Sequence, residues 1–216
     1  MRCRYWIFDM DGTLTDSMGP VWRAAPIALL AQYGIEAEPG LAEKLLTMTL
    51  AEGADYLRST YPLPLDDEGY AAAVRDVVPK LYETVELKPG VRELIARLQS
   101  EGAQMCICSN TWEAQCRTVL GRLGIADAFS FYLTAQGEYS KSKPAVFHEA
   151  MRRMGATDPA ECAVCEDSLY AARTARAEGF TVIGIADDSS RASADELRET
   201  SDQYLDDWTQ LDWTKV

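Results

Sequence analysis

Two kinds of hydrophobic pattern divide the chain. Between about residues 17 and 86, apolar positions recur at helical spacing, and no segment has the short β-branched or aromatic run of a buried strand. On both sides of this block, such runs alternate with helical segments. Strands that alternate with helices imply a parallel sheet covered on both faces. The expected strands lie at residues 5–8, 103–108, 129–133, 162–165, 181–185 and 203–205.

Helical segments account for most of the remaining sequence, and glycine or proline marks many of their ends. The capping-box sequence Thr49-Leu50-Ala51-Glu52 predicts the start of one of them. We therefore predict an α/β fold with two domains. A Rossmann-like parallel-sheet core consists of residues 1–16 and 87–216, and an all-helical domain, residues 17–86, interrupts it after the first strand. The expected helices lie at residues 21–33, 39–47, 49–61, 68–83, 89–100, 112–123, 144–154 and 169–178.

The composition is that of an ordinary globular protein, with an excess of acidic residues. Hydrophobic residues make up 47% and charged residues 25% of the 216 positions. The formal net charge of −13 argues against a nucleic-acid partner or an anionic membrane, because both require a basic surface. No apolar run approaches the roughly 20 residues that span a bilayer, and no signal peptide is visible. We expect a cytoplasmic protein that is a monomer or a weak homodimer.

The cysteines and the single histidine give little indication of a catalytic or metal-binding role. The six cysteines lie mostly inside apolar runs, so we expect small buried thiols in a reducing compartment rather than a zinc site. The single histidine, His148, falls within an expected helix. A histidine-centred triad or a multi-histidine metal site is therefore not expected.

Polar residues follow the expected strands where each strand ends. The first strand leads into the sequence Asp9-Met10-Asp11-Gly12-Thr13. Because side chains repeat every two residues in an extended chain, Asp9 and Asp11 can point to the same side. Ligands of open parallel sheets bind beyond the carboxyl ends of the strands, so we expect all these strand-end groups to gather in one site. The others are Ser109, Asn110, Glu166 and Asp167, with Lys143 in a polar loop before a helix.

This set of side chains suits a magnesium ion and a phosphate group. Hard carboxylate oxygens are the ligands that Mg²⁺ prefers. Asp9 and Asp167, with the backbone carbonyl of Asp11, are expected to hold the ion. With the neighbouring Glu166, these residues make up the predicted magnesium site: Asp9, Asp11, Glu166 and Asp167. The phosphate group is expected to contact backbone amides and polar side chains. The expected substrate-binding residues are Gly12, Thr13, Ser109, Asn110 and Lys143.

The two aspartates after the first strand can divide the chemistry between them. A carboxylate such as Asp9 can attack phosphorus and form an acyl phosphate. The incoming dianion would repel Asp9 unless Mg²⁺ and a lysine screen the charge. Asp11 would protonate the leaving oxygen and then deprotonate the hydrolytic water. Two lysines are candidates, and we favour Lys143 over Lys141 because Pro144 follows it. Asp187 and Asp188 are expected to be loop carboxylates in water.

The combined motifs resemble the haloacid dehalogenase superfamily, in particular the phosphatase subgroup that includes β-phosphoglucomutase and phosphoglycolate phosphatase. The resemblance covers almost the whole chain, including the helical cap inserted after the first strand. It implies Asp9 as nucleophile, Asp11 as acid and base, Ser109 and Lys143 on the phosphoryl group, and Asp167 on Mg²⁺. Glu166 would act nearby. Dehalogenation is not expected, since the dehalogenases lack an acid at the position of Asp11 and need no metal. The motifs are Asp9-Met10-Asp11-Gly12-Thr13, Ser109-Asn110, Lys143-Pro144 and Glu166-Asp167-Ser168.

Three functions are compatible with such a site. The first is a Mg²⁺-dependent phosphatase that acts on a small phosphorylated metabolite, with the cap selecting the leaving group. The second is a sugar phosphomutase of the β-phosphoglucomutase type. The mutases resembled have an arginine in a cap loop, whereas residues 45–50 here contain none, and only Lys44 and Arg58 flank them. The third is a non-catalytic phosphate-binding module, which is expected to have lost a catalytic position, and none is lost.

Overall fold

The computed structural model describes residues 3–45, 48 and 50–216. The chain divides into two compact units. The first contains Met1–Asp16 and Glu86–Val216, and the second contains Ser17–Val85. The second boundary lies one residue from the position expected from the sequence. No helix of the described residues is long and apolar enough to cross a membrane.

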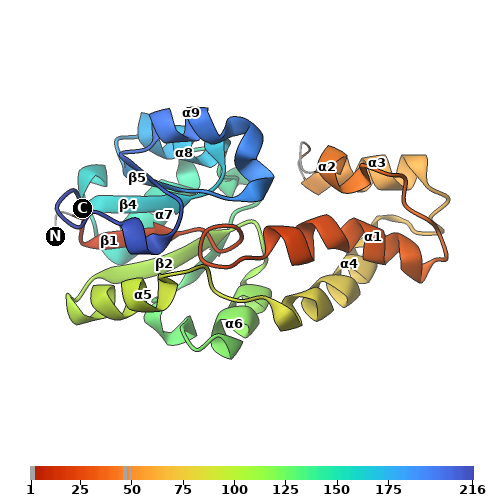
Figure 1. Ribbon diagram of the computed structural model, residues 1–216, viewed down its shortest axis with the longest axis horizontal. Coiled ribbons are helices and arrows are strands. Elements are labelled where there is room, and N and C mark those ends of the chain that lie inside the picture. Colours follow the sequence, from red (N-terminus) through yellow and green to blue (C-terminus); the bar gives the residue numbers. More distant parts are fainter. Residues whose placement is uncertain (1–2, 46–47, 49) are drawn as a thin grey trace. The chain divides into compact units, whose positions relative to one another are not determined.

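The first unit is built on a parallel β-sheet, as predicted. Its strand order is β3-β2-β1-β4-β5-β6. Figure 1 labels four of these strands, β2, β1, β4 and β5. The chain therefore builds the sheet outward from β1, first to one side and then to the other, and the order reverses beside β1. Open α/β sheets bind their ligands at such a reversal point, beyond the carboxyl ends of the strands. The strands are β1 Tyr5–Phe8, β2 Gln104–Ser109, β3 Tyr132–Thr134, β4 Cys162–Glu166, β5 Thr181–Ile185 and β6 Gln203–Leu205.

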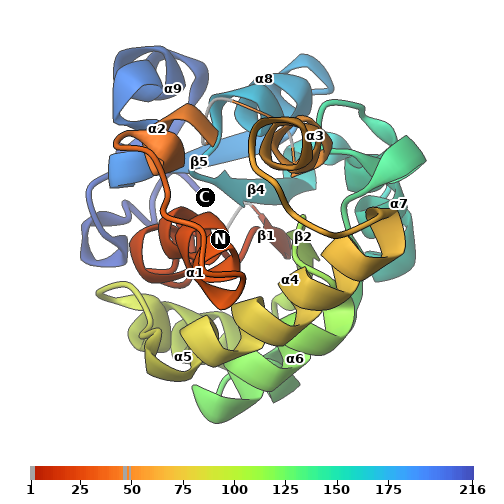
Figure 2. The same cartoon turned by 90° about the vertical axis from the view of Figure 1, so that its right-hand side faces the viewer.

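Helices cover both faces of this sheet (Figures 1 and 2). Helices α7 and α8 pack on one face, where α7 contacts β1 and β2 and α8 contacts β4 and β5. Helices α5 and α6 lie on the other face. The short helix α9 was not predicted from the sequence, and it packs against α8, β5 and β6. The bounds are α5 Val91–Ser100, α6 Glu113–Arg122, α7 Ala145–Met154, α8 Leu169–Ala177 and α9 Ala194–Thr200.

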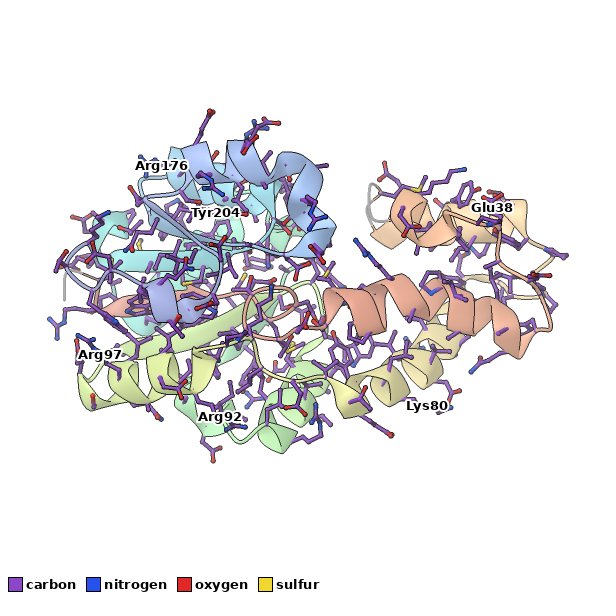
Figure 3. All side chains as sticks on the ribbon, in the orientation of Figure 1. Glu38, Lys80, Arg92, Arg97, Arg176 and Tyr204 are labelled. Carbon is purple, nitrogen blue, oxygen red and sulfur yellow. The ribbon has the colours of Figure 1, made fainter. Side chains whose placement is uncertain are left out.

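The outer surfaces of the helices carry charge. Lys80 of the second unit and Arg92 and Arg176 of the first are exposed (Figure 3). Arg176 forms an ion pair with Asp202 at the surface. Solvated side chains of this kind agree with the amphipathic patterns from which the helices were predicted.

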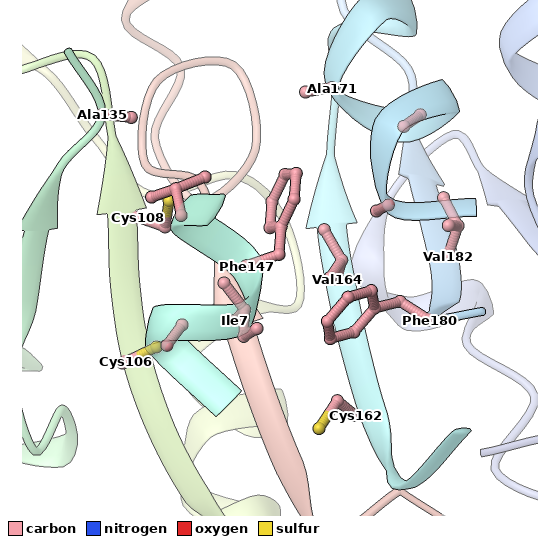
Figure 4. Close-up of a cluster of buried hydrophobic side chains, with 14 of the residues drawn as sticks. Ile7, Cys106, Cys108, Ala135, Phe147, Cys162, Val164, Ala171, Phe180 and Val182 are labelled. Atoms are coloured by element: carbon pink, nitrogen blue, oxygen red, sulfur yellow. The ribbon is translucent and has the colours of Figure 1, made fainter. Parts of the chain in front are cut away.

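Alternate residues of each strand face opposite sides of the sheet. Ile7 faces the cluster under α7 and α8, which includes Phe147, Val164 and Phe180 (Figure 4). Its neighbours Trp6 and Phe8 stack on each other at 5.8 Å, and Phe8 packs against Trp208 at 5.9 Å. The strand β1 is therefore covered by large side chains on both faces, which explains why its sequence is apolar throughout.

The second unit, Ser17–Val85, is helical in its described residues, as predicted. A π-helical turn at Met18–Arg23 leads into α1, and α1 packs along α4 through Leu29 and Val77. Leu30, Leu41 and Leu57 form a second cluster. Asp66 begins α4 by accepting a hydrogen bond from the Gly69 amide at 2.8 Å. The bounds are α1 Ala24–Gln32, α2 Leu41–Leu45, α3 Leu50–Thr60 and α4 Asp67–Leu81.

Part of one region discussed above lies outside the described residues. These positions are Leu46, Thr47 and Thr49. The expected end of the helix at 39–47, the capping residue Thr49 and part of the arginine-free segment 45–50 therefore stay predictions.

The two chain segments that join the units are paired within the first unit. The Asp16 amide donates to the Glu86 carbonyl at 3.0 Å, and the Lys88 amide donates to the Leu14 carbonyl at 2.9 Å. Thr15 and Leu87 form an antiparallel bridge between them. The outgoing and returning segments thus lie side by side next to the loop that carries Asp9 and Asp11.

Candidate active site

Strand pairing brings most of the predicted site residues to one edge of the sheet. Phe8 of β1 is level with Ile107 of β2 and with Cys165 of β4. Asp9 follows directly, and its amide donates to the Cys165 carbonyl at 3.0 Å. Ser109 and Glu166 end the two neighbouring strands. The groups that the sequence placed at strand ends are therefore neighbours because the three strands are parallel and in register.

A buried lysine joins the carboxylates of two strands, and it is Lys141. Its ammonium nitrogen lies 2.6 Å from Asp9 Oδ1 and 2.7 Å from Glu166 Oε1. Its side chain is 2% exposed. One positive charge between two carboxylates compensates part of the cost of burying them.

Lys143, which the sequence favoured, lies elsewhere. It is exposed, and its ammonium group donates to the Gly137 carbonyl at 3.4 Å. The Lys143 amide donates to the Ser140 carbonyl at 2.8 Å, so the chain turns between these residues and only Lys141 is directed inward. Pro144 begins α7 as expected, but a helix start does not determine which preceding side chain is buried. The preference for Lys143 is corrected by this geometry.

Asp11 is held by a residue that sequence reasoning missed. Its Oδ2 accepts a hydrogen bond from Thr111 Oγ1 at 2.7 Å, and both side chains are buried. The Thr111 amide in turn donates to Ser109 Oγ at 3.1 Å. The only signal in the sequence is that Thr111 lies two positions after Ser109 at the end of β2.

Gly12 and Thr13 shape the loop in which both aspartates lie. Gly12 has a φ of +78°, a value that favours glycine. Its amide donates to the Thr15 carbonyl at 2.9 Å, so this N–H stabilises the loop itself. The Thr13 carbonyl accepts from Trp208 Nε1 at 2.9 Å. Thr13 Oγ1 is buried and makes no hydrogen bond within the described part of the chain.

Asn110 also lies at this edge, beside a tyrosine that was not predicted to be part of the site. Asn110 Nδ2 donates to the Tyr170 hydroxyl oxygen at 3.1 Å. The Asn110 carbonyl accepts from Gln136 Nε2 at 3.2 Å. The loop after β2 is therefore tied to the beginning of α8 and to the loop after β3.

Burial raises the pKa of the carboxyl groups of Asp9, Glu166 and Asp167. For Asp9, burial outweighs the opposing effect of the Lys141 ammonium. For Glu166, burial raises the pKa to about 7 despite Lys141. For Asp167, burial and then the charges of Asp9 and Glu166 raise the pKa well above its ordinary value. Burial would lower the pKa of Lys141, but Asp9 and Glu166 raise it well above its ordinary value. Three carboxyl groups with one ammonium group form a site that favours additional positive charge.

Three of these carboxylates fit a divalent cation. Asp9, Glu166 and Asp167 each offer an oxygen within 4.8 Å of the others, and all three are buried. Glu166 Oε2 makes no hydrogen bond to any residue that the structure describes, so it is available as a ligand or as an acceptor for a ligand water. Hard oxygen donors with this spacing suit Mg²⁺. Among the described residues, the Asp11 side chain does not belong to this group of three carboxylates.

A second buried ion pair lies at the end of β5. Lys88 Nζ contacts Asp187 Oδ2 at 2.8 Å and donates to the Ala186 carbonyl at 2.7 Å. The Asp187 side chain is only 5% exposed, so the expectation that it lies in water was wrong. Its charge contributes to the raised pKa of Asp167. Asp188, in contrast, is exposed as expected and pairs with Arg191.

A parallel sheet that gathers buried carboxylates and a buried lysine at the carboxyl ends of its strands has the architecture of an α/β enzyme core. Residues 4–179 match the family described as haloacid dehalogenase-like hydrolase, and the chain belongs to that family. The resemblance noted in the sequence and the α/β fold are thus confirmed.

Similar proteins and structures with known names indicate which kind of hydrolase the chain resembles. Hexitol phosphatase B of Escherichia coli is 29% identical over 183 residues, which cover 82% of each chain. Phosphoglycolate phosphatase of Pseudomonas putida is 27% identical over 196 residues, 84% of this chain and 69% of that protein. The crystal structure of CbbY from Rhodobacter sphaeroides in complex with phosphate has a TM-score of 0.80 at 25% identity and covers 97% of this chain and 96% of that one. The protein is a phosphoric monoester hydrolase.

Proposed function

We propose that the protein is a Mg²⁺-dependent phosphatase that hydrolyses a small phosphomonoester through phosphorylated Asp9. The main observation that supports this proposal is the position of Asp9 in the fold and beside Lys141. It follows the central strand, it is 6% exposed, and its Oδ1 lies 2.6 Å from the Lys141 ammonium. A buried carboxylate beside a cation can receive an anionic substrate that it would otherwise repel.

In the first step, a carboxylate oxygen of Asp9 attacks phosphorus, and the bond from phosphorus to the ester oxygen breaks. Asp11 gives a proton to the departing alkoxide. The Thr111 hydroxyl holds the Asp11 carboxyl group in place at 2.7 Å. Lys141, and not Lys143, is assigned to neutralise charge on the phosphoryl group, together with a hydrogen bond from Ser109.

In the second step, a water molecule attacks the phosphorus of the acyl phosphate. Asp11, now ionised, takes the proton of that water, and the release of phosphate regenerates the Asp9 carboxylate. Mg²⁺, when bound, supplies positive charge that offsets the repulsion between the carboxylates and the phosphate. Asp9, Glu166 and Asp167 are the side chains that would hold it.

The alternative of a sugar phosphomutase is less favoured. The relatives reported above include named phosphatases. The described residues of the helical unit supply no observation that favours a second phosphate site. We expect the substrate to be a small phosphorylated metabolite and the helical unit to select its alcohol group.

Substitution of the proposed nucleophile tests this function. We expect Asp9→Asn to reduce the hydrolysis of p-nitrophenyl phosphate to background, because an amide oxygen is a poor nucleophile. Asp188→Asn, on an exposed carboxylate, is the matched control and is expected to retain full activity. EDTA should abolish activity, and excess Mg²⁺ should restore it. An active Asp9→Asn enzyme with native thermal stability, or full activity in EDTA, would contradict the mechanism.

A further inference from the structure

One side chain at the edge of the site has no part in the steps above. Tyr170 is the second residue of α8 and lies three positions after Asp167. It is 45% exposed, which places it with Tyr139 among the most exposed aromatic residues of the described part of the chain. Its hydroxyl nevertheless points to the site, because it accepts the hydrogen bond from Asn110 Nδ2 at 3.1 Å. The side chain is thus partly open to solvent, while its hydroxyl is held by a hydrogen bond.

The Asn110–Tyr170 hydrogen bond joins two segments that carry reacting groups. Asn110 directly follows Ser109, and Tyr170 follows the pair Glu166 and Asp167. Gln136 fixes the backbone of Asn110 from a third loop. The charges of Lys141, Glu166 and Asp9 all influence the pKa of the Tyr170 hydroxyl, which burial raises. The hydroxyl therefore lies within electrostatic reach of the nucleophile and of its lysine.

The direction of this hydrogen bond determines what Tyr170 can offer. A phenolic oxygen that accepts a hydrogen bond keeps its own proton to donate. The Asn110 amide thus orients the hydroxyl as a donor. The exposed ring adds a flat apolar face on which carbon atoms can pack. A donor beside an apolar face suits an alcohol that carries further oxygen atoms on a carbon chain.

We propose that Tyr170 is a specificity-determining residue that contacts the alcohol part of the substrate and favours phosphomonoesters of polyhydroxy alcohols over those of plain alkyl alcohols. This inference rests on the proposed phosphatase function. The hydroxyl donates to a substrate oxygen beyond the ester bond, and the ring packs against the carbon chain. Tyr170 takes no part in the transfer of the phosphoryl group itself.

Substrate pairs of equal length test the proposal. Propyl phosphate and glycerol 1-phosphate differ only in hydroxyl groups, and so do hexyl phosphate and glucitol 6-phosphate. For each pair, kcat and KM are measured for the unaltered protein, for Tyr170→Phe and for the control Tyr204→Phe. Tyr204 is a partly exposed tyrosine of β6 on the same unit, with its ring under Arg198. Thermal unfolding confirms that each variant is folded.

We expect Tyr170→Phe to lower kcat/KM for the polyhydroxy ester roughly three- to tenfold, the range that the loss of one hydrogen bond gives. The alkyl ester should be unaffected, and Tyr204→Phe should change neither. No change in kcat/KM for either ester in Tyr170→Phe overturns the proposal. An equal loss for both esters also overturns it, because the hydroxyl then only supports the loop of Asn110. Failure of the unaltered protein to hydrolyse any ester would instead contradict the phosphatase function.

Discussion

Lys141 shows how one side chain organises the site. Its ammonium group contacts Asp9 and Glu166, which belong to two neighbouring strand ends. Its positive charge lowers the pKa of both carboxyl groups and so opposes part of the effect of burial, which favours their protonated forms. A protonated Asp9 cannot attack phosphorus. Lys141 therefore serves the nucleophile before the substrate arrives and is proposed to serve the phosphoryl group afterwards.

A comparison of the two lysines tests this role. We expect Lys141→Ala to reduce kcat/KM for p-nitrophenyl phosphate by roughly 100-fold or more, the usual cost of losing one charge-stabilising donor. Lys143→Ala removes an exposed ammonium group two positions away and should stay within about twofold of the unaltered protein. The reverse result, an inactive Lys143→Ala enzyme beside an active Lys141→Ala enzyme, would restore the original preference for Lys143.

Some residues of the site could be placed from sequence and others could not. Asp9, Ser109 and Glu166 were expected to lie together because the ends of parallel strands meet at one edge. Lys141 and Tyr170 could not be placed in the same way. The turn between Ser140 and Lys143 decides which lysine is buried, and the hydrogen bond from Asn110 fixes the Tyr170 hydroxyl. Such choices depend on packing between loops, which leaves no periodic pattern in the sequence.

At the scale of elements, the start of α5 depends on one glycine. Gly90 precedes the helix with a φ of +83°. A Cβ atom there would lie 2.7 Å from the Thr209 amide nitrogen and 3.0 Å from the Trp208 carbonyl carbon. Both are backbone atoms, so they cannot move aside as a flexible side chain would. The helix start and the segment that carries Trp208 therefore pack too closely for any other residue.

Two glycine-to-alanine substitutions distinguish the cost of a strained backbone conformation from the cost of a steric contact. Gly102 has a similar φ of +73°, but a Cβ there would meet nothing within 4 Å. We expect Gly102→Ala to lower the free energy of unfolding by about 1 kcal/mol through backbone strain alone. Gly90→Ala should cost at least about 2 kcal/mol more, because the contact is added to the strain. Urea unfolding curves measure both, and equal losses would show that the contact relaxes without cost.

The elements with strong hydrophobic patterns were predicted best. The strands β1, β4, β5 and β6 lie where their apolar runs placed them, within a residue. The edge strand β3 begins at Tyr132, three residues later than expected. A 3₁₀ turn at Ala126–Ala128 precedes it, and the Phe129 ring packs against Phe8. The helix α9 was missed because its seven residues give too few turns for a clear helical period.

At the scale of the whole molecule, the cysteines belong to only one of the two units. All six are buried, and all lie in the unit formed by Met1–Asp16 and Glu86–Val216. Burial raises the pKa of Cys108 to about 12, and that of Cys162 likewise to about 12. Thiolate, the reactive form, is therefore scarce at neutral and mildly alkaline pH.

Thiol labelling is expected to follow the unfolding of that unit. At pH 8 and without denaturant, Ellman's reagent should modify fewer than one thiol per chain within minutes, since a raised pKa keeps the thiols protonated until the pH exceeds it. In guanidinium chloride all six should react. Far-ultraviolet circular dichroism measures the loss of secondary structure in both units, and its unfolding transition is compared with the denaturant dependence of labelling. Rapid labelling of several thiols in the native protein would show that the sheet is not closed around them.

The change from one hydrophobic pattern to the other located the boundary between the units, and the structure divides the chain within one residue of it. The sequence could not show how the chain crosses that boundary. The pairing of Asp16 with Glu86 at 3.0 Å brings the exit and the return together. A segment whose two ends lie side by side can be removed or exchanged without a change in the strand order of the sheet. A turn of a few residues between these positions would close the chain again, so the helical insert can be replaced by another whose two ends lie equally close while the catalytic edge keeps its connectivity.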